Sequence, residues 1–156
     1  MNIDELREFI FKASVATYAG GGKEEDNPER QGFKELVYTD GDWNYRDSYT
    51  GFFRARGMEV IRHKNIPVWT ASYGGGMITG KENMAKATHI FLKKAMLAKD
   101  PEKYSARGPH HFTDGNYEYS YTQDGGIEEF NGYEEICLKG EPVFFHRIIG
   151  GTIIHN

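Results

Sequence analysis

The chain of 156 residues contains one cysteine, five prolines and no long hydrophobic run. A single cysteine, Cys137, excludes an intrachain disulfide and is typical of proteins from a reducing compartment. A membrane-spanning helix needs roughly 20 consecutive apolar residues, and because the sequence has no such run, we expect no membrane partner. The acidic and amphipathic start, residues 1–6, lacks the basic and apolar segments of a signal peptide. These absences predict a cytoplasmic protein.

Basic residues are too few for a nucleic-acid-binding surface. The chain has 19 Lys and Arg against 23 Asp and Glu, a formal net charge of −4, whereas proteins that neutralise phosphates present a basic stripe. The glycines of residues 20–23 run into acidic residues and lack the spacing of a phosphate-binding loop. The adjacent His110 and His111 have no partners at metal-ligand spacing. We therefore expect no nucleic-acid binding by this chain alone, no cofactor and no metal.

Aromatic residues and glycines, by contrast, are abundant. Aromatics make up 14% of the chain, which also has 19 glycines. This composition favours short antiparallel strands joined by tight turns, because pleated surfaces accept flat side chains and turns need positive φ. A length of 156 residues suits a single domain. We predict one domain over residues 1–156.

The most informative feature is internal self-similarity. Residues 57–78 and 132–153 align without a gap at an offset of 75, and nine of these 22 positions are identical. The identical pairs are Gly57/Gly132, Glu59/Glu134, Ile61/Ile136, Lys64/Lys139, Pro67/Pro142, Val68/Val143, Gly75/Gly150, Gly76/Gly151 and Ile78/Ile153. Repetition at a fixed offset is typical of a duplicated structural unit. We predict two repeats, about 1–78 and 79–156.

Each repeat begins with a helical pattern and continues with strand patterns. Apolar residues recur at helical spacing over 3–18 and 84–96. Later aromatic and β-branched runs are separated by turn signals, among which we count Arg56-Gly57 and Asn131-Gly132. The predicted fold is α+β, a tandem duplication of a helix plus antiparallel β-meander unit. With pseudo-two-fold symmetry, its two helices would pack on antiparallel sheets that join or face each other around one core.

A candidate site lies where the two repeats differ. Arg46 and Asp47 have no counterpart in the second repeat, and they lie between Tyr45 and Tyr49. On a strand, the two tyrosines and Asp47 share one face, and Arg46 points to the other. A guanidinium binds carboxylates or phosphates, and tyrosine rings stack on flat ligands. The cluster predicts a site for a small polar or aromatic ligand, with a cross-strand ion pair under aromatic cover as the structural alternative.

Two further segments extend this candidate site. Trp69 and Tyr73 precede three glycines, which let a ligand approach the backbone closely or form a bulge shared by both repeats. The segment 107–112 offers an arginine and a histidine that could reach a pocket from a surface turn. The predicted ligand-binding residues are Tyr45, Arg46, Asp47, Tyr49, Trp69, Tyr73, Arg107 and His111.

Several motifs resemble those of a bacterial and archaeal domain family of unknown function. They are Tyr45-Arg46-Asp47-Ser48-Tyr49-x-Gly51, Gly57-x-Glu59-Val60, Pro67-Val68-Trp69-x3-Tyr73-Gly74-Gly75, Tyr104-x2-Arg107-Gly108-Pro109 and Phe130-Asn131-Gly132-x-Glu134. Domains of that family occur alone or appended to Cro/C1-type helix-turn-helix regulators. The resemblance implies an effector sensor. Because this chain has no recognition-helix unit outside the two repeats, we do not expect it to regulate DNA by itself.

These observations favour a non-catalytic, sensor-like domain that binds a small molecule in a pocket lined by aromatics and Arg-Asp. One alternative is a protein-interaction or sequestering module that binds a partner through an exposed strand edge or the polar segment 20–31. Another is a hydrolase of a small polar substrate that uses Asp47 and His111. No motif of an enzyme family is present, so we lean against catalysis. Ligand identity and the choice between monomer and homodimer stay open.

Overall fold

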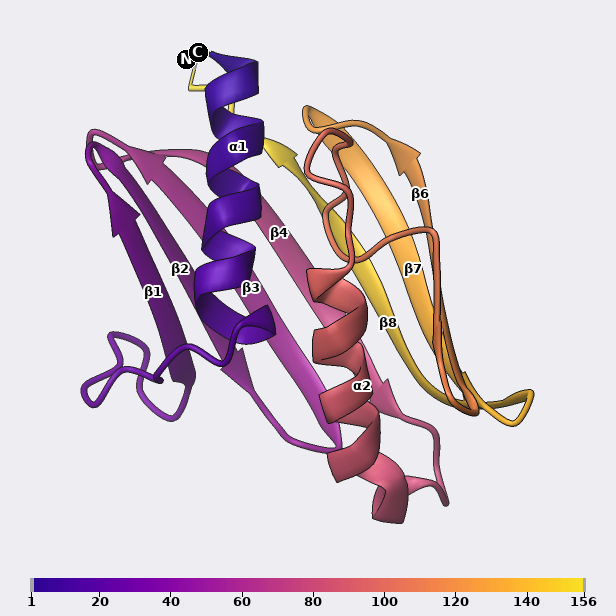
Figure 1. The fold of residues 1–156 in the computed structure, drawn as a ribbon. Helices are drawn as coiled ribbons and strands as arrows, with labels where there is room; N and C mark the ends of the chain where they lie inside the picture. The colour runs from indigo at the N-terminus through magenta and orange to yellow at the C-terminus, as the bar shows by residue number, and fades with distance from the viewer. Residues whose placement is uncertain (1, 156) are drawn as a thin grey trace.

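The computed structural model describes residues 2–155 as one antiparallel sheet of eight strands with two helices (Figure 1). The α+β class is therefore confirmed. The helical elements are α1 (Ile3–Ser14), the π-helical turn η1 (Val15–Ala19), the 3-10 turn η2 (Glu82–Met84) and α2 (Ala85–Leu97). The strands are β1 (Lys34–Asp40), β2 (Trp43–Thr50), β3 (Arg54–His63), β4 (Ile66–Met77), β5 (His111–Asp114), β6 (Tyr117–Gly125), β7 (Glu129–Leu138) and β8 (Glu141–Thr152).

The strand order is β1-β2-β3-β4-β8-β7-β6-β5, and every neighbouring pair is antiparallel. Strands β1–β4 and β5–β8 each form a meander, and the two meanders meet where β4 pairs with β8, from Trp69↔Thr152 to Met77↔Phe144. Of the two arrangements expected from the sequence, the structure has the joined sheet. The duplication itself stays a prediction.

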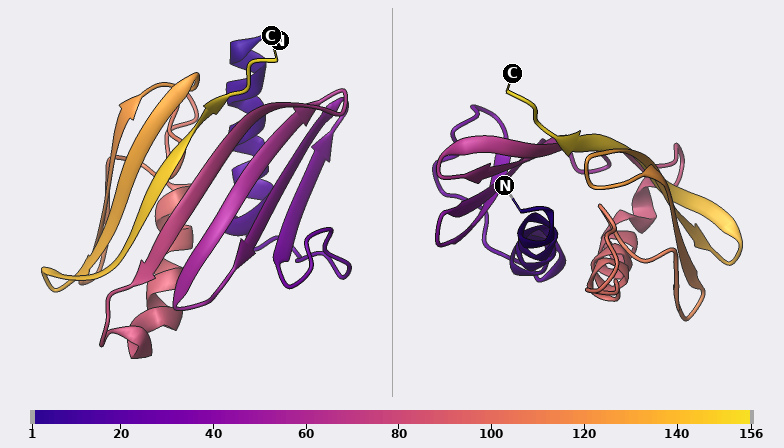
Figure 2. Two further views of the ribbon diagram at one scale, coloured as in Figure 1. Left: turned by 180° about the vertical axis from the view of Figure 1, so that it is seen from behind. Right: turned by 90° about the horizontal axis from the view of Figure 1, so that it is seen from above.

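Both helices lie on the same face of the sheet, which curves around them (Figure 2). The side of α1 that faces the sheet buries Leu6, Phe9, Ile10 and Ala13, which have helical spacing. The corresponding side of α2 buries Ala85, Thr88, Phe91, Leu92, Ala95 and Met96. The core lies between the helices and this concave face. Among the described residues, no helix has the length and apolarity to span a bilayer.

Two of the turns predicted from the sequence are not turns in the structure. Arg56-Gly57 lies inside β3 and Asn131-Gly132 lies inside β7, so each of these strands is continuous. The glycines serve packing, because a Cβ at Gly57 would clash with the ring and hydroxyl of Tyr73, and a Cβ at Gly132 would clash with Tyr121. Each strand therefore lets a neighbouring tyrosine ring lie across its backbone.

The helix termini differ in how far they follow the sequence signals. The Asn2 side chain accepts a hydrogen bond from the Asp4 N–H at 2.9 Å and caps α1, as its position indicates. Residues 79–82 have the Thr-x-x-Glu pattern of a capping box, but they do not cap α2, since Met84 is the N-cap residue and makes no side-chain cap bond. Glu82 instead accepts from the Gly80 N–H at 2.9 Å.

Candidate functional site

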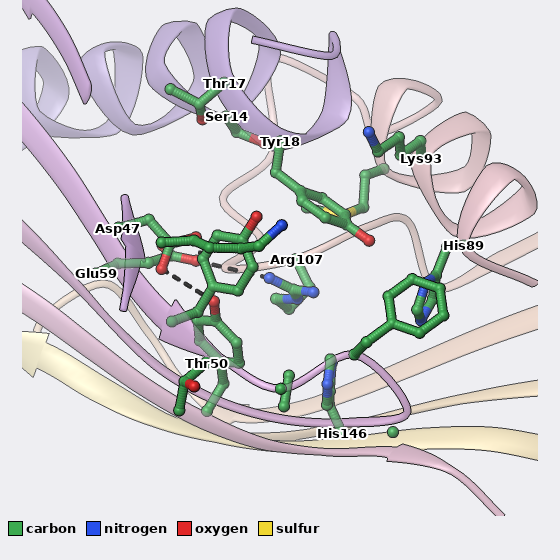
Figure 3. A pocket seen from close by; sticks show the side chains of 18 of the residues that line it. Ser14, Thr17, Tyr18, Asp47, Thr50, Glu59, His89, Lys93, Arg107 and His146 are labelled. Carbon is green, nitrogen blue, oxygen red and sulfur yellow. Dashed lines mark hydrogen bonds and ion pairs between the residues drawn. The ribbon is translucent and has the colours of Figure 1, made fainter. Parts of the chain in front are cut away.

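A cavity of about 510 Å³ lies between the two helices and the concave face of the sheet (Figure 3). Its walls come from α1, η1, α2, strands β2, β3, β4 and β8, and the connection before β5. Five of the eight residues that the sequence predicts as ligand-binding line it: Tyr45, Asp47, Tyr49, Tyr73 and Arg107. The structure thus brings together side chains from β2, β4 and the segment after α2.

The alternation of β2 explains which of its residues reach the cavity. Tyr45, Asp47 and Tyr49 point to the helix side, as their spacing of two requires. The intervening Arg46 and Ser48 both bind Glu35 of β1 on the other side of the sheet. Strand β2 therefore separates a cavity face from an ion-paired outer face.

The other three predicted residues lie outside the cavity, and we leave them out of the proposed site. Arg46 pairs with Glu35 and with Glu29, the latter at 2.9 Å, which is the cross-strand ion pair weighed as the alternative. Trp69 is fully buried in the core, where its size and apolarity suit it, and its ring Nε1–H donates to a backbone oxygen at 3.2 Å. His111 is exposed on the edge strand β5, with its Nδ1 3.6 Å from Glu118.

Two acidic residues lie side by side on the cavity floor. Asp47 of β2 and Glu59 of β3 are direct partners in the strand register, so their side chains share one face. The Tyr73 hydroxyl donates to the Asp47 carboxyl at 2.9 Å. Burial, reinforced by the negative charge of Glu59, raises the pKa of Asp47 to about 8, and burial also raises the pKa of Glu59. Asp47 is therefore protonated at neutral pH.

A second buried carboxylate, Glu134 of β7, has a full set of partners. Its oxygens accept from Arg107 Nη2 at 3.0 Å and from the Tyr119 hydroxyl at 2.9 Å, and His146 Nδ1 lies 2.8 Å away. Although burial would raise it, Arg107 and His146 lower the pKa of Glu134 to about 2. Glu134 is therefore an anion that fixes Arg107 and His146 in place.

His146 of β8 lines the cavity and has one ring nitrogen without a partner among residues 2–155. Burial lowers its pKa, so the imidazole is neutral at neutral pH. Because the ionised Glu134 can only accept, the ring proton is on Nδ1 and Nε2 carries a lone pair. Nε2 is buried and has no hydrogen-bond partner within residues 2–155. The ring lines the cavity and points up from the sheet towards it (Figure 3).

The helices cover the cavity with polar and aromatic side chains. Tyr18 of η1 lies in the opening between the helices, with the Lys93 ammonium 5.0 Å from its ring centre. Burial raises the pKa of Tyr18 to about 12, so its hydroxyl stays protonated. The buried Ser14 hydroxyl also lines the cavity and has no partner among the described residues.

Three buried site residues were missed from the sequence: Glu59, Glu134 and His146. The two glutamates appeared there as one of the identical pairs at offset 75 and within two of the family motifs, but the candidate site was sought where the repeats differ. His146 lies in an apolar run, and only the pairing Glu134↔His146 between β7 and β8 gives it a partner. Among residues 2–155, no group of three or more His, Cys, Asp or Glu could hold a metal ion.

Fold and cavity together define an α+β protein in which a cavity lined by aromatic, charged and apolar side chains lies between a curved sheet and two helices. Residues 47–153 match the family described as "Domain of unknown function (DUF5680)". The match covers more than half of the chain, so the protein belongs to this family. No curated protein and no solved structure matches it.

Proposed function

We propose that this domain binds a small organic molecule in the cavity between the helices and the sheet, without catalysing a reaction. The observation that carries the proposal is the cavity itself, whose volume of about 510 Å³ lies in the range of ligand sites. Its walls combine tyrosine rings with a few convergent polar groups, a combination typical of ligand pockets. A folded core without a ligand would normally be packed to a much higher density.

A sensing role is the finer form of this proposal. It is supported by the resemblance of the sequence motifs to domains that are appended to helix-turn-helix regulators. In a sensor, the bound molecule stabilises the cavity walls, and the helices above the sheet are the elements that would respond to it. This proposal includes a cytoplasmic location, which the single cysteine supports.

A second candidate function, hydrolysis of a small polar substrate, is favoured by one specific observation. Glu134 orients His146, which lines the cavity, and leaves its Nε2 without a partner among residues 2–155; a general base requires a lone pair oriented in this way. His111, the histidine first considered for this role, lies outside the cavity. The catalytic hypothesis therefore moves from His111 to His146.

We also infer that the two meanders descend from one duplicated unit. Each has a register shift at the same place, after Ile61 in β3 and after Ile136 in β7, which are 75 positions apart. The buried Glu59 and Glu134 are separated by the same offset and occupy equivalent strands. The inference matters for function because a residue that the fold requires should be present in both halves. Polar residues present in only one half are therefore candidates for binding.

Native mass spectrometry of the purified protein tests the proposed function. We expect a mass excess from a co-purifying small molecule, lost in Ala55→Trp, because Ala55 lines the cavity and an indole would fill it. The matched control is Arg56→Trp on the next residue of β3, which is exposed on the opposite face. A mass excess that survives Ala55→Trp, or one that Arg56→Trp removes equally, would place the molecule elsewhere.

A further inference from the structure

We propose that the cavity selects a small organic cation, of the amidinium or primary ammonium class, whose charged nitrogen lies between the carboxyl groups of Asp47 and Glu59. The inference deepens the proposed function and rests on it, because it assigns a ligand chemistry to the same cavity. Four features of the site support it: the paired carboxyls, the engagement of Arg107 by Glu134, the unpartnered His146 nitrogen and the tyrosine walls.

The first feature is the acidic pair itself. Asp47 and Glu59 are opposite each other on neighbouring strands and on the same face, where like charges are destabilising. Within residues 2–155 the Glu59 carboxyl makes no hydrogen bond, and its only salt bridge is to Arg107 Nη1 at 3.6 Å, while the more distant Lys99 also lowers its pKa, which burial raises. Figure 3 shows both acidic side chains on the same side of the cavity, facing Arg107. Asp47 holds a proton in the free protein. A cation between the two side chains would replace that proton and receive charge-assisted hydrogen bonds that the protein does not supply.

The second feature comes from comparing the two halves of the sheet. Glu134 is opposite His146 in the register and also binds Arg107, whereas Glu59 is opposite the apolar Ala71. Arg107 thus completes the hydrogen bonds of the Glu134 carboxylate, whereas the Glu59 carboxyl is left without a hydrogen bond among the described residues. It donates through Nε and Nη2 to Glu134, at 3.4 and 3.0 Å, so its planar fork is not available to an anionic ligand.

The third feature is independent of the carboxyls. The His146 side chain lines the cavity and is 7% exposed, and its buried Nε2 is a hydrogen-bond acceptor without a partner among residues 2–155. An unsatisfied buried acceptor is costly, and a ligand that donates an N–H would satisfy it. The ring centroid is 5.6 Å from that of Tyr73, whose hydroxyl binds Asp47, so the histidine and the acidic pair belong to one cluster.

The fourth feature is the composition of the walls. Tyr45 and Tyr49 lie on either side of Asp47 in β2 and line the cavity with it, and the Tyr73 hydroxyl binds Asp47. Tyr18 approaches from the helices (Figure 3). Aromatic faces attract cations as well as flat apolar groups, and the attraction is strongest where water is excluded. The walls therefore suit an organic cation with an aromatic or aliphatic body better than a hydrated metal ion.

Three probes of matched shape test the charge preference: benzamidine, benzamide and benzoate. Each is titrated at neutral pH into the 15N-labelled protein, and the dissociation constant is read from the amide shifts of the strands that form the cavity. We expect benzamidine to bind at least tenfold more tightly than benzamide or benzoate, as charge-assisted bonds to buried carboxylates imply. Equal affinities, or a preference for benzoate, would overturn the proposal.

Variants locate the charge that is responsible. Glu59→Gln should weaken benzamidine binding about tenfold or more and leave benzamide within a few-fold, and Asp47→Asn, which also keeps the side-chain shape, should have the same effect. The control is Glu135→Gln, a carboxylate on the opposite face of β7 that binds Tyr133 at 3.0 Å. Benzamidine affinity that is unchanged in both acidic-pair variants contradicts the cation site.

The outcomes separate this inference from the proposed function. If benzamide or benzoate shifts the cavity resonances and benzamidine has no advantage, the cavity binds small molecules but not cations. If none of the three probes shifts cavity resonances at millimolar concentration, the cation site is overturned. The proposed function then stands or falls by the mass excess of the purified protein.

Discussion

Replacing Asp47 by Asn should make the protein more stable, and by an amount that grows with pH. In the folded protein, burial beside Glu59 raises the pKa of Asp47 to about 8, whereas an unfolded aspartate has a pKa of about 3.9. Between these values the folded state holds one proton more than the unfolded state, so unfolding releases a proton. The free energy of unfolding therefore falls as pH rises, and the stability that the protonated form provides is lost towards pH 8.

The magnitude follows from the linkage relation. One proton of difference changes the free energy of unfolding by about 1.4 kcal/mol per pH unit. Between about pH 5.5 and 7.5 the wild type should thus lose about 2.7 kcal/mol that the Asn variant keeps. An Asn at this position still offers an oxygen to the Tyr73 hydroxyl, so the main hydrogen bond of Asp47 is preserved.

The assay is urea unfolding of both proteins at several pH values, followed by tryptophan fluorescence. The other buried titrating groups, including Lys99, whose pKa burial lowers to about 8, are common to both proteins. The difference between the two curves therefore reports the titration of Asp47 together with its effect on the neighbouring Glu59. Curves that run parallel across this pH range would refute the assignment of a protonated Asp47.

Three further variants test the packing of the Tyr73 ring on Gly57, the ion pair of Arg46 and the surface position of His111. Gly57→Ala should cost about 1–3 kcal/mol in urea unfolding, because the new methyl group forces the Tyr73 ring aside; an unchanged midpoint would contradict this. Arg46→Ala should cost about 2 kcal/mol, because it removes the ion pair to the buried Glu35, and it should leave ligand binding in the cavity unchanged. A loss of binding without a loss of stability would show that Arg46 belongs to the binding site. His111→Ala should change neither the melting temperature nor binding, since this side chain is 59% exposed; a clear change in either is evidence against a surface role.

Much of the secondary structure could be predicted from local patterns. The apolar spacing of α1 and α2 and the alternation of the strands are set by which residues must be buried. Turns such as Asp40-Gly41 and Lys64-Asn65 lie between strands in the structure, with positive φ at Gly41, Lys64 and Asn65. Local patterns failed at Gly57, because a glycine that makes room for a ring from another strand looks the same in sequence as a glycine in a turn.

The site was harder to predict than the elements that form it. Strand alternation placed Tyr45, Asp47 and Tyr49 on one face, but the sequence alone could not tell which face the helices would cover. Arg46 was selected because it is not duplicated, yet its charge is used by Glu35 on the outer face. Predicting His146 as a site residue requires the register between β7 and β8, which pairs it with Glu134. This register is set by the whole sheet rather than by neighbouring residues.

The most direct test is a crystal structure of the protein with bound benzamidine. The account predicts density for the ring against the cavity tyrosines, with the amidinium within hydrogen-bonding distance of both Asp47 and Glu59. Density for benzamidine only outside the cavity, or inside it with the amidinium turned away from both carboxyls, would contradict the account.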